Sequence, residues 1–187
     1  GTAEEPVCKE KAVLYAGGLS EEYGILELVE AFLNTNEKDW KLELIGDGPL
    51  LSTLKQMAGE HDSLVVRGLQ PNSEVLKRQK EVSILVNPRK AQQEFTKYSF
   101  PSKTIEYMAS GTPMVGYRLP GIPGEYFEHF YAVSSDDQGL ESYLKKVMML
   151  SDHERTKFGL SAKQFIQTEK NAAKQCAKIM QLIEKIS

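Results

Sequence analysis

Apolar residues along the chain follow two alternating patterns, short runs with strand character and longer segments with helical periodicity. Strands are expected at residues 12–16, 41–45, 64–67, 82–86, 113–117 and 131–133. Strands that alternate with helical segments are typical of an α/β domain with a largely parallel sheet. The run 82–86 suits a strand buried on both faces, so we expect it at the centre of the sheet and 131–133 at its edge.

The segments between these runs carry apolar side chains at three- and four-residue intervals, which predicts helices with one buried face. The first helix is expected after Ser20 as its N-cap, and later helices begin near residues 50, 73 and 102. Beyond residue 139 the chain is expected to be helical, with apolar stripes at 140–148, 158–166 and 172–183 that predict three helices. The second of these follows a capping box that runs from Ser151 to Glu154.

Length and composition predict one soluble globular domain. The chain has 187 residues, of which 41% are hydrophobic and 26% charged, and its formal net charge is -3. This charge gives no basic field that would attract nucleic acid. The longest apolar runs fall well short of the roughly 20 residues that span a bilayer. Residues 1–5 have no feature of a signal peptide and look like a cut end.

The two cysteines and three histidines predict neither a disulfide framework nor a metal site. Cys8 and Cys176 are too far apart for a CxxC motif, and a reducing, cytoplasmic compartment is expected. Cys176 falls in a helical repeat and is expected to be a small buried residue. The histidines show no HxH or HExxH spacing, so no metal is expected.

Glycines and cations gather where the predicted strands end. They are Gly17 and Gly18 after the first strand, Gly46 and Gly48 after the second, Arg89 after the fourth, and Ser102 and Lys103 at the start of the next helix. Ligands of an open parallel sheet bind outside the carboxyl ends of its strands. Glycine lets a backbone approach a phosphate, and a helix amino-terminus supplies N–H donors. The arrangement suits a nucleotide.

Each of these signals also has a simpler interpretation. A Gly-Gly pair after a strand is commonly a turn, and the sequence contains neither a dinucleotide fingerprint nor a P-loop. Arg89 and Lys103 are equally consistent with solvated surface charges. Ser102 suits the N-cap of its helix, and Glu106 suits a solvated carboxylate on the polar face of that helix.

Several strings of the sequence together resemble one known family. They lie at residues 15–19, 23–25, 44–50, 87–89 and, above all, in the PSKxxEYMxxGxP string at 101–113. In order and coverage they resemble the carboxyl-terminal, donor-binding domain of family-4 glycosyltransferases, which have the GT-B fold. The resemblance implies that residues 1–187 form a Rossmann-like three-layer domain with a mostly parallel sheet, the second half of a GT-B fold.

The resemblance implies transfer of a sugar, with retention of configuration, from a nucleoside-diphosphate sugar to an acceptor such as a glycan or lipid-linked glycan. No metal or other cofactor is expected. The acceptor site would belong to an amino-terminal domain that this chain lacks, so the isolated chain is expected to bind the donor and transfer little or no sugar. Nucleic acid is not an expected partner, and contact of the parent protein with the cytoplasmic face of a membrane stays open.

In the resembling family, the second glutamate of an E-x7-E motif hydrogen-bonds the ribose hydroxyls, and the motif puts this role at Glu106. The first glutamate falls at Tyr98, where this sequence departs from the family. Tyr98, Ser99 and Phe100 are expected to face the donor sugar.

A second departure concerns the family's diphosphate clamp, an arginine and a lysine whose positions fall here at Gly18 and Tyr23. We therefore expect Arg89 and Lys103 to hold the diphosphate and to stabilise its charge as the glycosidic bond breaks, which makes them the candidate catalytic residues. Further donor contacts are expected from the backbone at Gly17, Gly18 and Gly48 and from Ser102 and Thr104.

Two other functions are compatible with the same residues. One is a non-catalytic sugar-nucleotide-binding module, in which the missing glutamate and clamp residues reflect decay. The other is a GT-B-type epimerase or phosphorylase. Uracil, guanine and adenine donors all fit the sequence.

Overall fold

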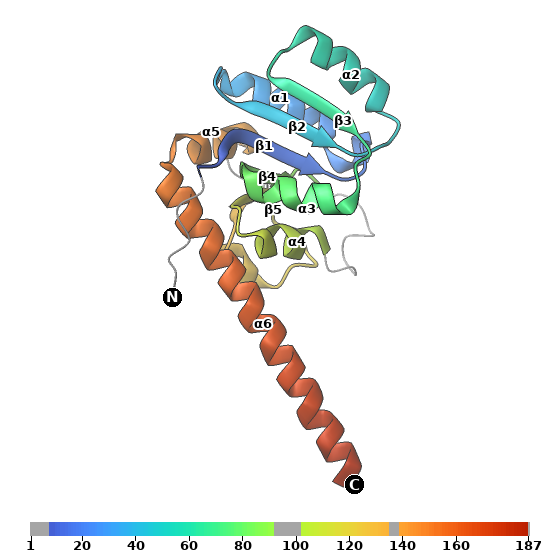
Figure 1. Ribbon diagram of the computed structural model, residues 1–187, viewed down its shortest axis with the longest axis vertical. Helices are drawn as coiled ribbons and strands as arrows, with labels where there is room; N and C mark the ends of the chain where they lie inside the picture. Colours follow the sequence, from blue (N-terminus) through green and yellow to red (C-terminus); the bar gives the residue numbers. More distant parts are fainter. Residues whose placement is uncertain (1–7, 92–101, 135–138, 187) are drawn as a thin grey trace.

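The computed structural model describes residues 8–91, 102–134 and 139–186, which form one six-stranded sheet with helices on both faces (Figure 1). The strands are β1 (Glu10–Ala16), β2 (Lys41–Ile45), β3 (Leu64–Gly68), β4 (Val82–Asn87), β5 (Met114–Tyr117) and β6 (Tyr131–Val133). All neighbouring strands are parallel, in the order β3-β2-β1-β4-β5-β6. This is the Rossmann-like order, and it confirms the predicted fold, with β4 inside the sheet and β6 at its edge.

The helices divide between the two faces of the sheet. The apolar core on one face takes its helical side chains from α1 (Ile25–Thr35), α2 (Leu51–Glu60) and α5 (Gly139–Met149). The core on the other face takes them from α3 (Asn72–Glu81), α4 (Ser102–Ser110) and α6 (Asp152–Ile186). Two short 3-10 turns, η1 (Glu21–Tyr23) and η3 (Gly124–Glu128), complete the described elements.

The inner strands bury side chains on both faces, which is why their sequences are almost continuously apolar. In β1, Val13 and Tyr15 enter the core of α1, α2 and α5, whereas Leu14 and Ala16 enter the core of α3, α4 and α6. The side chains of successive strand residues point to opposite faces, so one short run supplies both cores.

The start of α1 differs from the prediction. Ser20 does not cap the helix, because the 3-10 turn η1 intervenes and α1 begins only after Gly24, which has a φ of 75°. A Cβ atom at Gly24 would lie 2.5 Å from the Pro88 carbonyl oxygen. Glycine is therefore required here both by the left-handed backbone and by the close approach of the loop after β4.

The carboxyl-terminal helix also differs from the prediction. The capping box is confirmed, since the Ser151 hydroxyl accepts the Glu154 N–H at 3.2 Å and Glu154 accepts the Ser151 N–H at 2.8 Å. These bonds to Ser151 lower the pKa of Glu154. However, a single helix of 35 residues replaces the two helices predicted from its stripes.

The long helix α6 packs on α4 along its first half and then extends away from the sheet (Figure 1). The polar segment 167–171 contains no glycine or proline, so the helix continues where its buried stripe ends. Cys176 lies in the extended part and is exposed, so the prediction that it is buried was wrong. Within the residues that the structure describes, no helix is both long and apolar enough to cross a bilayer.

Candidate functional site

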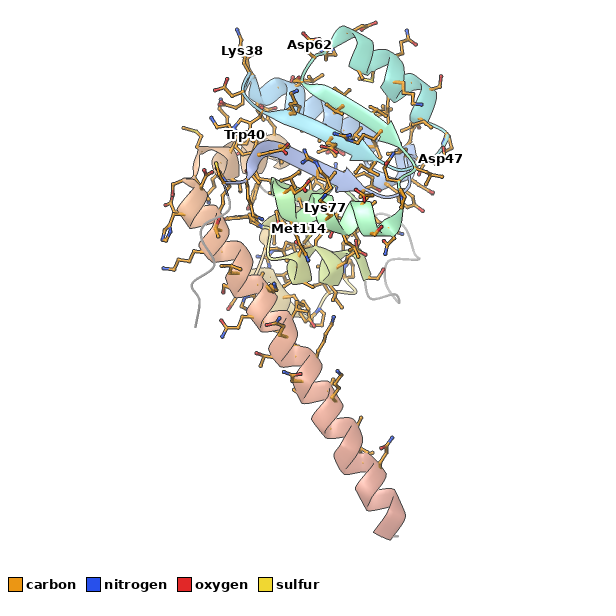
Figure 2. All side chains as sticks on the ribbon, in the orientation of Figure 1. Lys38, Trp40, Asp47, Asp62, Lys77 and Met114 are labelled. Carbon is orange, nitrogen blue, oxygen red and sulfur yellow. The ribbon has the colours of Figure 1, made fainter. Side chains whose placement is uncertain are left out.

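Two adjoining pockets lie at the carboxyl ends of the strands, where the order of the sheet reverses between β1 and β4. The first has a volume of about 310 Å³ and is lined by Ala16, Gly17, Gly18, Ile45, Gly46, Asp47, Leu69, Gln70, Asn72, Val75, Lys103 and Glu106. The second, of about 270 Å³, is lined by Tyr15, Gly17, Gly18, Tyr23, Asn87, Arg89, Ser102 and Lys103. Figure 2 shows Asp47 at this end of the sheet and Lys38 at the opposite end.

The loops after β1 and β2 are joined by backbone contacts that shape both pockets. The Gly17 N–H donates to the Ile45 carbonyl at 2.9 Å, and the Leu19 N–H donates to the Asp47 carbonyl at 2.9 Å. A Cβ atom at Gly46 would lie 1.8 Å from the Gly17 carbonyl oxygen, so only glycine allows this approach. Gly17 therefore lines the site, but its N–H is not free for a ligand, which corrects the prediction.

Gly18 fits the prediction better than Gly17. Within the described part of the chain, no acceptor is bonded to its N–H. Its carbonyl accepts the Tyr15 hydroxyl at 2.9 Å, which holds the backbone that follows it. Gly18 therefore offers one backbone donor between the two pockets.

Lys103, in the first turn of α4, forms the wall shared by both pockets. Its ammonium donates to the Ala16 carbonyl and lies over the rings of Tyr15 and Tyr107, 5.5 Å from each centroid. Burial lowers the pKa of Lys103, and the nearby Glu106 carboxylate opposes this shift. A half-buried cation that lies against two aromatic rings is thus held at the carboxyl end of β1.

Tyr107 attaches α4 to the end of β1. Its side chain is fully buried, and its hydroxyl accepts the Ala16 N–H at 3.0 Å. Burial also raises the pKa of this hydroxyl. The bond satisfies a backbone donor just before the Gly17 loop, so it fixes the position of α4 relative to that loop.

Arg89 lies on the other side of the second pocket and stacks on an aromatic ring. Its guanidinium carbon lies 5.3 Å from the centroid of the Tyr23 ring. A Cβ atom at Gly18 would lie 2.6 Å from the same ring, so Tyr23 occupies the space that a side chain at position 18 would need. The absence of a side chain at Gly18 therefore leaves room for the Tyr23 ring on which Arg89 stacks.

The loop that carries Arg89 is held by a second contact. Lys90 forms an ion pair with Glu27 at 2.7 Å, and Glu27 also accepts the Tyr117 hydroxyl at 3.1 Å. These groups come from the start of α1, the loop after β4 and the end of β5. They restrain the backbone beside Arg89.

Glu106 is one helical turn beyond Lys103 on the same side of α4 and lines the first pocket. Its Oε1 atom accepts the Gln79 Nε2–H at 2.6 Å. Gln79 belongs to α3 and is completely buried. Sequence analysis did not single out Gln79, because it lies in a polar helix whose pattern indicates a solvated surface.

Two predicted residues lie elsewhere. Thr104 is 1% exposed and lines neither pocket, because its position one residue after Lys103 turns it, with Met108, toward the core. Gly48 lies beside the site, but its N–H donates to the Asp47 carboxylate at 2.8 Å, and a Cβ there would lie 2.4 Å from the Leu19 carbonyl oxygen. Its role is close packing rather than ligand contact.

The remaining predictions divide between the second pocket and the residues that the structure does not describe. Ser102 lines the second pocket, as expected for a residue at the start of α4. Tyr98, Ser99 and Phe100 lie outside the described residues.

Comparison with known proteins decides the family. The sequence profile of the family described as "Glycosyl transferases group 1" matches residues 10–150. The chain belongs to this family. The match begins at β1 and ends just after α5, so this glycosyltransferase family accounts for the sheet, both pockets and all helices except α6.

The curated relatives that the chain matches are longer than the chain. N-acetyl-alpha-D-glucosaminyl L-malate synthase of Bacillus anthracis is 29% identical over 124 residues, which cover 64% of this chain and 30% of that protein. The chain thus spans about a third of that relative's length.

Two solved structures support the fold. The carboxyl-terminal domain of the group 1 glycosyl transferase LpcC from Francisella tularensis has a TM-score of 0.68 and 18% identity, with 85% of each chain covered. A point mutant of TarM from S. aureus, solved with fondaparinux, alpha-GlcNAc-glycerol and UDP, has a TM-score of 0.65 and 17% identity, with 83% of this chain and 31% of that chain covered. At these identities the likeness concerns the fold alone.

Proposed function

We propose that this chain is the donor-binding part of a retaining, metal-independent glycosyltransferase that uses a nucleoside-diphosphate sugar. The observation that carries the proposal is the placement of Lys103 and Glu106 one turn apart at the start of α4, beside the Gly18 backbone at the end of β1. A cation and a carboxylate at this spacing match the diphosphate and the ribose of one nucleotide. The UDP bound by the TarM mutant supports the same class of ligand.

The two pockets divide the donor between them in this proposal. The nucleoside occupies the first pocket, where Glu106 accepts hydrogen bonds from the ribose hydroxyls and Ile45 and Val75 supply apolar surface. The diphosphate lies between Lys103, Arg89 and the Gly18 N–H. The sugar contacts Tyr98, Ser99 and Phe100 in this proposal.

The chemical role of the two cations follows from the reaction. When the glycosidic bond breaks, its electron pair stays with the diphosphate, whose negative charge increases. Lys103 and Arg89 stabilise that charge more strongly in the transition state than in the bound donor, and only this difference accelerates the reaction. Because Lys103 is half-buried and Arg89 is stacked on Tyr23, both are oriented before the donor binds.

The acceptor side of the reaction belongs, in this proposal, to an amino-terminal domain joined to this chain. The isolated chain then binds the donor nucleotide and transfers little sugar. We further propose that the parent protein works in the cytoplasm and that its acceptor is a glycan or a lipid-linked glycan. Chelation of divalent cations is expected to leave transfer unchanged.

A binding screen tests the donor-binding proposal. We expect one of UDP, GDP or ADP to raise the melting temperature of the chain and to bind in calorimetry, because a ligand of the folded state stabilises it. Glu106→Ala should abolish binding, and Arg89→Ala and Lys103→Ala should each weaken it at least tenfold. Glu60→Ala, on the distant helix α2, is the matched control. Unchanged affinity in the first three variants would overturn the placement of the donor.

A non-catalytic sugar-nucleotide-binding module is the second candidate function. It is favoured by Gly18 and Tyr23, which stand where the resembling family has its clamp cations. The chain joined to its amino-terminal domain separates the two candidates. Sugar transfer by that protein supports the enzyme, whereas nucleotide binding without transfer or donor hydrolysis supports the module.

A further inference from the structure

Gln79 is a buried amide whose side chain ends against the carboxylate of Glu106. It lies in the last turns of α3, is 0% exposed, and donates from Nε2 to Glu106 Oε1 at 2.6 Å. Its backbone is anchored as well, since its carbonyl accepts the Thr112 hydroxyl at 2.6 Å and Thr112 accepts the Lys9 ammonium at 2.5 Å. The donor that faces Glu106 is therefore rigid.

The surroundings of Gln79 do not explain why an amide is buried there. Among the described residues, its Oε1 atom has no hydrogen-bond partner, so the bond to Glu106 is the one that its side chain makes. A buried amide with an unpaired oxygen destabilises the fold relative to an apolar side chain of the same shape. What this amide provides in return is a donor aimed at a carboxylate that lines the nucleotide pocket.

The amide restricts Glu106 in two ways. An exposed glutamate on a helix samples several rotamers, whereas the bond to Gln79 selects the one in which the carboxylate borders the first pocket. An amide nitrogen can only donate, so the bond also occupies one lone pair of Oε1 and leaves the other acceptor sites of the carboxylate for a ligand. Glu106 then presents Oε2 and the remaining lone pair of Oε1 as two acceptors in a fixed plane.

We propose that Gln79 is a positioning residue that sets the Glu106 carboxylate to accept both hydroxyls of a ribose, so that the site selects ribonucleotides over 2′-deoxyribonucleotides. This inference rests on the proposed donor-binding function. A fixed pair of acceptors rejects a ligand that lacks one hydroxyl, because one charge-assisted hydrogen bond is then missing. A mobile carboxylate readjusts to the remaining hydroxyl and discriminates less.

Other charged groups near Glu106 act on both nucleotide forms alike. Lys103 faces it from α4. Lys80 of α3 and Lys170 of α6 line a neighbouring hollow of about 370 Å³ that Glu106 and Gln79 also border. These cations attract the Glu106 carboxylate without fixing which of its oxygens faces the pocket.

Calorimetry with matched nucleotide pairs tests the proposal. The probes are UDP, GDP and ADP, each beside its 2′-deoxy counterpart, and the variants are Gln79→Met and Gln79→Glu, with the exposed Gln56→Met of α2 as the control. We expect the wild type and the control to prefer the ribonucleotide at least tenfold. Gln79→Met, which keeps the shape but loses the donor, should reduce this preference to about threefold or less.

The glutamate variant adds a pH signature that a merely structural residue would not show. At pH 8, Gln79→Glu places two carboxylates together, and its affinity relative to wild type should fall at least tenfold. Near pH 5.5, one carboxyl is protonated and donates in place of the amide, so the ratio to wild type should recover. This measurement also serves if Gln79→Met does not fold.

The outcomes separate the inference from the proposed function. If the wild type binds a ribonucleotide that Glu106→Ala no longer binds, but both Gln79 variants keep the wild-type preference and pH profile, the role of Gln79 is overturned while the donor site stands. If the wild type binds none of the six nucleotides, the donor site itself is wrong, and the role of Gln79 is wrong with it.

Discussion

The two faces of the sheet bury different kinds of side chain. The core under α1, α2 and α5 is built from apolar side chains such as Leu28, Leu44 and Leu144, all fully buried. Its buried polar side chains Thr35 and Arg155 bond to backbone carbonyls of α1 and of the end of α5. On the side of α3 and α4, the buried polar groups include Glu43, Gln79 and Thr112. Glu43 is paired with Arg78 of α3 at 2.9 Å, and Gln79 reaches Glu106.

This difference indicates that the two faces have different tasks. Apolar packing without polar partners stabilises a fold but orients no ligand group. On the second face, Thr112 bonds to Gln79, Gln79 bonds to Glu106 and Tyr107 bonds to the end of β1, so these polar groups reach the edge where the pockets lie. We therefore expect substitutions of the apolar helix side chains on the first face to change stability alone, and substitutions of these polar groups on the second face to change nucleotide affinity as well.

The largest effect is expected from a cavity in the apolar face. Leu28→Ala should lower the free energy of unfolding by about 2–5 kcal/mol, because a fully buried leucine side chain is removed. Urea denaturation measures this loss. Nucleotide affinity of the folded fraction, measured by calorimetry, should stay within twofold of wild type. A large loss of affinity would contradict the idea that the two faces have different tasks.

A second effect is expected where the loop after β1 contacts the loop after β2. Gly46→Ala would place a Cβ atom 1.8 Å from the Gly17 carbonyl oxygen, so both loops must move apart. Strain of this kind costs about 1–3 kcal/mol, and nucleotide affinity should fall with it. The matched control is Gly59→Ala in α2, where no atom lies within 4 Å of the new Cβ. That helix variant should gain about 0.5–1 kcal/mol of stability.

Tyr107→Phe tests the role of the polar groups on the face of α3, α4 and α6. Loss of the hydroxyl leaves the buried Ala16 N–H without its partner, which should cost about 1–3 kcal/mol of stability. Nucleotide affinity should also fall several-fold, because α4 and its Lys103 are less firmly held against the end of β1. Tyr131→Phe, whose side chain is only partly buried, should stay within about 0.5 kcal/mol of wild type. Equal affinities in both variants would contradict the positioning role.

The smallest effect is a pH dependence of binding from Lys103. Burial lowers its pKa in the free protein, and a bound diphosphate raises it again, so binding takes up a proton above the free-state pKa. Affinity should therefore fall as the pH rises through that pKa, by up to about tenfold per pH unit. Calorimetry between pH 8 and 10.5 avoids the titration of the phosphates themselves.

The control for this pH dependence is Lys103→Arg. An arginine stays protonated throughout this range, so its affinity, whatever its absolute value, should be flat with pH. A parallel fall in both proteins would assign the titration to another group.

Several features of this protein could be predicted from the sequence because they depend on neighbours along the chain. The strand at 41–45 and the edge strand at 131–133 have the predicted bounds, and the capping box at Ser151 forms as expected. The spacing of Lys103 and Glu106 predicted that they lie on one side of a helix beside the strand ends, and both line the first pocket there. Short-range periodicity and helix caps are local properties, which is why they can be inferred without a structure.

The features that could not be predicted depend on which elements meet in space. Gln79 lies in a polar helix, yet the packing of α4 against α3 buries it and turns it to Glu106. The Gly17 N–H is already bonded to the Ile45 carbonyl because the loop after β2 lies against it. Cys176 is exposed because α6 extends beyond the sheet. The sequence by itself determined the strands, most of the helices, their order along the chain and the chemistry at the strand ends. Only the tertiary structure decided which polar groups are free for a ligand, because hydrogen bonds between distant segments are made only when those segments pack together.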